Sequence, residues 1–159
     1  MNRAALEQLI GGGESETLEF KRTTGELREA METLCGFLNH RGGTILIGVG
    51  PRGRIVGQQV TDNTLHDVTT AVRNIEPVPQ VDVARVGVGD GKDVIVLRAA
   101  PGTQGPYNCD GRPFVRVGNT TRRMKREEYE RTARPCSPPL SEPMGDDSGR
   151  WLGGSETST

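Results

Sequence analysis

The chain has 159 residues, a formal net charge of −1, 33% apolar residues and only 4% aromatic residues. This length fits one domain whose core is large enough to fold without disulfides or a structural metal. The 22 glycines and 10 prolines indicate many turns and some unfolded sequence. No apolar run approaches the roughly 18 to 20 residues that cross a bilayer, and the three cysteines form no CxxC pair and follow no secretory signal. We therefore expect a cytoplasmic protein that does not enter a membrane.

The near-zero net charge hides an uneven distribution along the chain. Residues 1–111 carry 11 basic and 14 acidic side chains, whereas residues 112–134 carry eight basic and three acidic ones. We call residues 112–134 the basic segment. A run with this excess of arginine and lysine is a candidate for contact with phosphate groups.

The N-terminal half predicts four elements in succession. Asn2 is placed to cap a short helix that a glycine run ends, so residues 1–13 should form a helix and a glycine linker. Apolar residues alternate with polar ones over 17–21, which indicates a half-buried strand. Over 25–38 they recur every three or four positions, as in a helix laid on a sheet. The run 44–49, which is rich in β-branched residues and has no charged one, is typical of a strand that is buried on both faces.

The C-terminal half predicts a second core helix and further strands. A helix should start near Thr61 or Asp62 and stop near Glu76, because prolines follow. Two alternating runs, 81–86 and 93–97, flank a glycine-rich turn and so indicate a β-hairpin. A last strand is expected at 114–117, and a short charged helix at 125–133.

These elements define the expected domain organisation. Residues 14–134 should form one α+β domain, a mixed β-sheet with two main helices packed on it. Residues 135–159 are rich in proline, serine, glycine and acidic residues without periodicity, which predicts a disordered tail.

One apparent nucleotide-binding motif fails on its context. Residues 48–53 match GxGxxG and follow a strand, as a dinucleotide-binding loop should. Such a loop must open a helix whose N-terminus receives the pyrophosphate. Here residues 54–56 favour a strand, so we predict a hairpin turn at this point.

A larger pattern is more specific. Glu14-Ser-Glu-Thr-Leu-Glu-Phe-Lys is followed by the Leu-Cys-Gly-Phe-Leu-Asn-His-Arg-Gly-Gly-Thr-Ile-Leu-Ile-Gly-Val run of residues 34–49, then by 53–57, and finally by Phe-Val-Arg-Val-Gly-Asn-Thr-Thr at 114–121. In order and spacing these pieces closely resemble the Schlafen AlbA-like domain family. The resemblance implies a nucleic-acid-binding module that serves a regulatory or targeting role, with DNA or RNA as partner.

Such a module needs cations at the ends of strands and helices, because phosphate contacts supply most of the sequence-independent affinity. The turn after the first long helix also offers amide donors to a phosphate. Aromatic side chains near the basic segment are few, which favours backbone or shape recognition over base recognition. The predicted nucleic-acid-binding residues are Lys21, Arg22, Asn39, Arg41, Arg116, Arg122, Arg123, Lys125 and Arg126.

The resemblance also implies an enzymatic alternative, a metal-dependent endoribonuclease. Schlafen-type nucleases use two glutamates that match Glu14 and Glu19, together with an aspartate, and these would hold Mg²⁺ or Mn²⁺. Pro51 stands where that aspartate is expected. We therefore favour a binding domain without a cofactor, in which Glu19 pairs with Lys21 or with an arginine across the sheet.

Two further expectations come from the resemblance. Related bacterial domains are often the N-terminal part of longer ATP-binding transcriptional regulators, so the chain could be a fragment of one. Schlafen-type grooves are made from paired copies of this unit, which raises the possibility of a homodimer.

Overall fold

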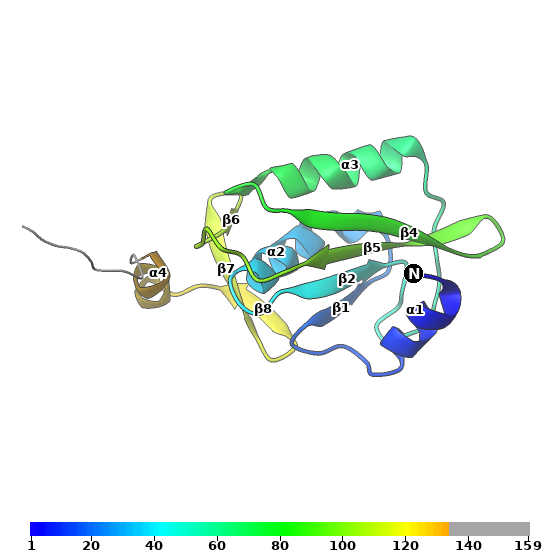
Figure 1. Ribbon diagram of the computed structural model, residues 1–159, viewed down its shortest axis with the longest axis horizontal. Coiled ribbons are helices and arrows are strands. Elements are labelled where there is room, and N and C mark those ends of the chain that lie inside the picture. The colour runs from blue at the N-terminus through cyan, green and yellow to red at the C-terminus, as the bar shows by residue number, and fades with distance from the viewer. Residues whose placement is uncertain (134–159) are drawn as a thin grey trace, which may run out of the picture.

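The computed structural model describes residues 1–133 (Figure 1). The predicted tail, 135–159, lies outside the described residues. The elements in chain order are α1 (Arg3–Ile10), β1 (Leu18–Lys21), the 3-10 turn η1 (Thr24–Glu26), α2 (Leu27–Leu38), β2 (Gly43–Ile47), α3 (Asp62–Arg73), β3 (Ile75–Glu76), β4 (Val81–Gly89), β5 (Lys92–Ala99), β6 (Asn108–Cys109), β7 (Arg112–Val117), β8 (Thr120–Arg123) and α4 (Arg126–Ala133).

The strands form two four-stranded sheets. The main sheet has the order β1-β2-β5-β4, in which β1 runs parallel to β2 and the other neighbours are antiparallel. The second sheet has the order β3-β6-β7-β8 and is antiparallel. The fold is therefore α+β with a mixed sheet, as the sequence predicts, but the C-terminal strands form a sheet of their own.

The main sheet is buried on both faces. On one face, Ile45 and Ile47 of β2 pack in a cluster with residues of α2 and α3. On the other face, Leu46 packs with Leu6 and Ile10 of α1. β2 is thus buried on both sides, which explains why its sequence is rich in β-branched residues and has no charged one.

α2 joins the two sheets, with the second sheet packed against it (Figure 1). At Gly36 a side-chain β-carbon would lie 3.3 Å from the backbone nitrogen of Arg116. A glycine at this position lets β7 approach the helix closely. The backbone of β7, and with it the side chain of Arg116, is thereby held against α2.

The structure confirms most predicted elements and corrects two. Asn2 and Thr61 cap α1 and α3 as expected, but α3 ends at Arg73 because Ile75 enters β3. The predicted strand 54–56 is reduced to a single bridge between Val49 and Ile55.

The structure also contains a strand at residues 120–123, which the sequence does not predict. They form β8, paired with β7. The tight turn at residues 118–119 allows β8 to pair with the strand that precedes it.

The glycine-rich residues 48–53 form the predicted hairpin turn. The amide of Gly50 donates to the carbonyl of Arg54 at 2.8 Å, and the amide of Gly53 donates to that of Gly50 at 2.9 Å. The next helix begins only at Asp62, so the geometry of a dinucleotide loop is missing here. Among residues 1–133 no helix has the length and apolar composition to span a bilayer.

Candidate nucleic-acid interface

β1 places Glu19 and Lys21 on one side and Leu18 and Phe20 on the other, because side chains alternate along a strand. The Lys21 ammonium lies 3.2 Å from Oε2 of Glu19, and a guanidinium nitrogen of Arg116 lies 3.0 Å from Oε1. Both oxygens of Glu19 are therefore engaged by cations. The predicted pairing of Glu19 with Lys21 or with an arginine is confirmed, and both partners are present.

Arg116 is a buried link between the main sheet and the second sheet, and it does not lie on the surface as the sequence prediction assumed. It is 2% exposed. Its guanidinium donates to the carbonyl of Ser15 at 2.7 Å and to the hydroxyl of Thr121 at 3.0 Å, and lies 5.0 Å from the ring centre of Phe37. Because β7 turns this side chain onto α2, a phosphate in solution does not reach it.

Asn39 likewise has an internal role. Its side-chain NH₂ group donates to the carbonyls of Tyr107 at 2.9 Å and Phe114 at 2.8 Å, and its carbonyl oxygen accepts from the Tyr107 amide at 2.7 Å. Both amide protons are used, so this side chain has no donor left for a phosphate. Asn39 instead ties the end of α2 to the strands of the second sheet.

Glu14, Glu19 and Pro51 line one depression, so the structure brings the two predicted metal ligands and the proline together. One oxygen of Glu14 accepts the Phe20 amide at 2.9 Å. Within residues 1–133, no three His, Cys, Asp or Glu side chains are grouped to hold a metal ion. A cation that bound Glu19 would have to compete with Arg116 and Lys21 for its carboxylate.

The basic segment is partly neutralised by its own acidic residues. Arg122 of β8 binds Glu128 of α4 through two parallel contacts of 2.8 Å each. This pair and the Lys125 amide lower the pKa of Glu128 from an ordinary 4.5 to about 2. Arg126 pairs with Glu130 at 3.3 Å. Of the four predicted surface cations here, Arg123 and Lys125 are exposed and make no ion pair within the described chain.

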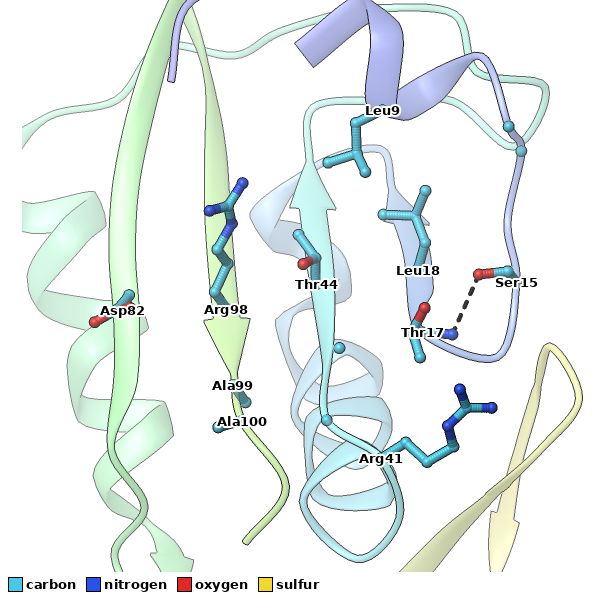
Figure 2. A pocket seen from close by; sticks show the side chains of 14 residues that line it. Leu9, Ser15, Thr17, Leu18, Arg41, Thr44, Asp82, Arg98, Ala99 and Ala100 are labelled. Atoms are coloured by element: carbon cyan, nitrogen blue, oxygen red, sulfur yellow. Dashed lines mark hydrogen bonds between the residues drawn. The ribbon is translucent and has the colours of Figure 1, made fainter. Parts of the chain in front are cut away.

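Arg41 lies in the turn between α2 and β2, beside a depression of about 550 Å³ (Figure 2). It forms an ion pair with Glu16, which also accepts from His40 at 3.2 Å. These two hydrogen bonds lower the pKa of Glu16. Thr44 of β2 and Arg98 of β5 also line the depression and lie side by side (Figure 2). Arg98 is not among the residues that the sequence predicts to bind nucleic acid.

The sequence prediction named only one member, Arg22, of a second group of cations. A depression of about 530 Å³ at the hairpin turn is lined by eight residues, none of which is acidic. Four of the eight are exposed cations, which we call the hairpin cation cluster: Arg22, Arg52, Arg54 and Lys92. None of the four forms an ion pair with another residue in the 1–133 range.

The signal for this cluster is weak in the sequence because its members are scattered. Arg22 follows β1, Arg52 and Arg54 flank Gly53 in the turn, and Lys92 begins β5. No run of like charge marks them. The predicted hairpin could have suggested that Arg52 and Arg54 project together, but only the tertiary fold brings Arg22 and Lys92 beside them.

Two solved structures resemble this chain. The solution structure of the N-terminal domain of a RecG-related protein from Nitrosomonas europaea has 22% identity and a TM-score of 0.56, and the match covers 79% of this chain and 94% of that one. The crystal structure of the DIP2311 protein from Corynebacterium diphtheriae has 20% identity and a TM-score of 0.51, over 72% of this chain but only 23% of that protein. At these identities the likeness shows the fold alone.

Comparison with curated proteins gives no match. Comparison with protein families gives a match over residues 14–125 to a family that is described as Schlafen, AlbA_2. The match includes the Glu14 to Lys21 element, both core helices and the second sheet through β8. The chain belongs to the Schlafen, AlbA_2 family.

Proposed function

We propose that this domain binds nucleic acid through the phosphate backbone, and that the hairpin cation cluster makes the main contact. The observation that carries the proposal is the lining of the hairpin depression, which contains four exposed cations and no acidic residue. Uncompensated cations attract phosphates and release the counterions condensed on the nucleic acid, which drives sequence-independent binding. Arg123 and Lys125 would add weaker contacts at the other basic surface.

Recognition of the backbone is favoured over recognition of bases. Proteins that bind single strands commonly stack bases on exposed aromatic side chains. Four of the five aromatic residues in the 1–133 range are at most 7% exposed, namely Phe20, Phe37, Tyr107 and Phe114. The hairpin depression itself is lined by arginine, lysine and aliphatic side chains, which suit phosphate contact.

The proposal is tested by the binding of fluorescent tRNA and duplex DNA over a range of salt concentrations, with Mg²⁺ or Mn²⁺ present. We expect the nucleic acid to stay intact and the affinity to fall steeply as salt rises. Arg52→Ala with Arg54→Ala should weaken binding by about tenfold or more, since each lost charged contact is worth about 1.5–3 kcal/mol before solvent screening.

The matched control is Arg28→Ala with Arg73→Ala, which removes the same charge from exposed positions on α2 and α3. This control should bind almost as the unchanged protein does. If both double variants lose affinity equally, net charge and not the hairpin cation cluster governs binding. If no nucleic acid binds even at low salt, the proposed function is wrong.

The same assay examines the nuclease alternative, which the shared depression of Glu14 and Glu19 favours. A nuclease would shorten the labelled tRNA only when metal is present, and Glu14→Ala or Glu19→Ala would abolish the cleavage. Glu14→Ala is the cleaner variant, because Glu19 also holds the buried Arg116 and its loss would destabilise the fold.

A further inference from the structure

The hairpin cation cluster surrounds a hollow, and its cations come from three separate parts of the chain. Arg22 stands at the end of β1, Arg52 and Arg54 come from the turn, and Lys92 comes from the start of β5. An internal phosphodiester carries one negative charge and continues in both directions. A terminal phosphate carries about two negative charges near pH 7 and has three free acceptor oxygens. Four cations around one hollow match the terminal group better in charge and in number of donors.

A second depression beside the hairpin disfavours a nucleic-acid strand that would continue in that direction. It shares Arg22 and Pro51 with the hairpin depression, and it is also lined by three carboxylates, those of Glu14, Glu19 and Glu26. The only other cation in its lining, Lys21, already pairs with Glu19. Glu14 and Glu26 form no ion pair within residues 1–133, so their carboxylates would repel a phosphate backbone that extended into this depression. A strand that ends at the hairpin avoids this repulsion.

The hairpin is also held in a fixed shape. Gly53 has a positive φ of 83°, and a β-carbon there would lie 2.8 Å from the side chain of Ile10 on α1. The turn is closed by the Gly50 to Arg54 hydrogen bond and by the Val49–Ile55 bridge. Arg52 and Arg54 are therefore presented by a backbone that needs little ordering when a ligand binds, which lowers the entropic cost of binding.

From these observations we infer that the hairpin cation cluster binds the terminal phosphate of a nucleic-acid strand, a phosphomonoester, in preference to an internal phosphodiester. This inference rests on the proposed function and adds the part of the nucleic acid that is recognised. The strand then leaves the site on the side away from Glu14, Glu19 and Glu26.

The experiment compares short labelled duplexes of one sequence that carry a 5′-phosphate, a 3′-phosphate or only hydroxyl ends. We expect at least one phosphorylated duplex to bind about tenfold more tightly than the hydroxyl-ended duplex, which corresponds to about 1.4 kcal/mol. Arg54→Ala should remove most of this difference, while Arg28→Ala with Arg73→Ala should keep it. A nucleoside monophosphate should compete for the site, and the nucleoside without phosphate should not.

The outcomes separate the inference from the function it rests on. If all three duplexes bind equally and Arg52→Ala with Arg54→Ala weakens them equally, the end preference is wrong and the proposed function stands. If none of the duplexes binds at low salt, both are wrong. A preference for the phosphorylated end that survives Arg54→Ala would also overturn the assignment, because it would place the terminal phosphate elsewhere.

Discussion

The two basic regions of the domain differ in how their charges are used. The basic segment has the highest density of arginine and lysine in the sequence, but Arg116 is buried against Glu19, and Arg122 and Arg126 pair with glutamates of α4. The hairpin cation cluster has no such density in the sequence, yet no acidic residue lines its depression. The more conspicuous region in the sequence is thus the more neutralised one in the fold.

This difference shows why a charge count along a chain is an unreliable guide to surface potential. Neutralisation in the basic segment comes from helix spacing and from contact between neighbouring elements. Arg126 and Glu130 are one helical turn apart, and Arg122 reaches Glu128 from β8. Arg52 and Arg54, by contrast, form no ion pair within residues 1–133.

The largest effect should come from reversing charge in each region separately. Arg52→Glu with Arg54→Glu should reduce the affinity for duplex DNA or tRNA on the order of a hundredfold at low salt, because two attractive contacts become repulsive. Arg123→Glu with Lys125→Glu, which makes the same change in net charge, should reduce it less than tenfold. Fluorescence anisotropy gives both dissociation constants, and an equal loss in the two variants would erase the distinction between the regions.

The salt dependence should separate the regions in a second way. Each phosphate contact contributes about 0.9 to the slope of log affinity against log salt concentration for duplex DNA. A triple variant that combines Arg22→Ala, Arg52→Ala and Arg54→Ala should reduce the magnitude of this slope by about two to three. Arg122→Ala with Arg123→Ala should weaken binding but lower the slope by only about one, since Arg122 is already paired. A drop of two in that double variant would mean that Arg122 contacts phosphate despite Glu128.

Local features of the fold could be predicted from the sequence with success. The cap at Asn2, the periodicity of α2 and the hairpin turn between β4 and β5 depend on residues that are close in the chain, so the pattern determines them. The role of Glu19 was also predictable, because its position on the same side of β1 as Lys21 follows from strand alternation.

The site itself was less predictable because it depends on contacts between distant segments. Nothing near Arg116 in the sequence indicates that β7 packs it against α2 and Glu19. Asn39 resembles an exposed turn residue until Tyr107, 68 positions away, is brought to its side chain. The hairpin cation cluster likewise exists only after β1, the turn and β5 have come together.

A smaller effect should follow when Arg122 is released from its partner. Glu128→Gln removes one of the two charged groups of the pair, so it should raise the affinity for nucleic acid about twofold to fivefold, as expected for partly exposed charges. Glu7→Gln is the matched control, because it changes the net charge equally and releases Arg3 on α1. If both variants raise the affinity equally, the gain reflects net charge and does not come from the basic segment.

The smallest expected effect is a shift of the Glu128 pKa, which tests whether the Arg122–Glu128 ion pair forms in solution. The pKa of Glu128 is lowered to about 2 by Arg122 and the Lys125 amide, so the pair should add stability above pH 4.5 and lose that contribution as the pH falls through about 2. In a carbon-detected NMR titration the Glu128 carboxyl should titrate near 2, and Arg122→Ala should move its midpoint back toward 4.5. A midpoint near 4.5 in the unchanged protein would show that the pair does not form. Arg122 would then be as uncompensated as the cations of the hairpin cation cluster, and the difference in phosphate binding between the two regions should narrow.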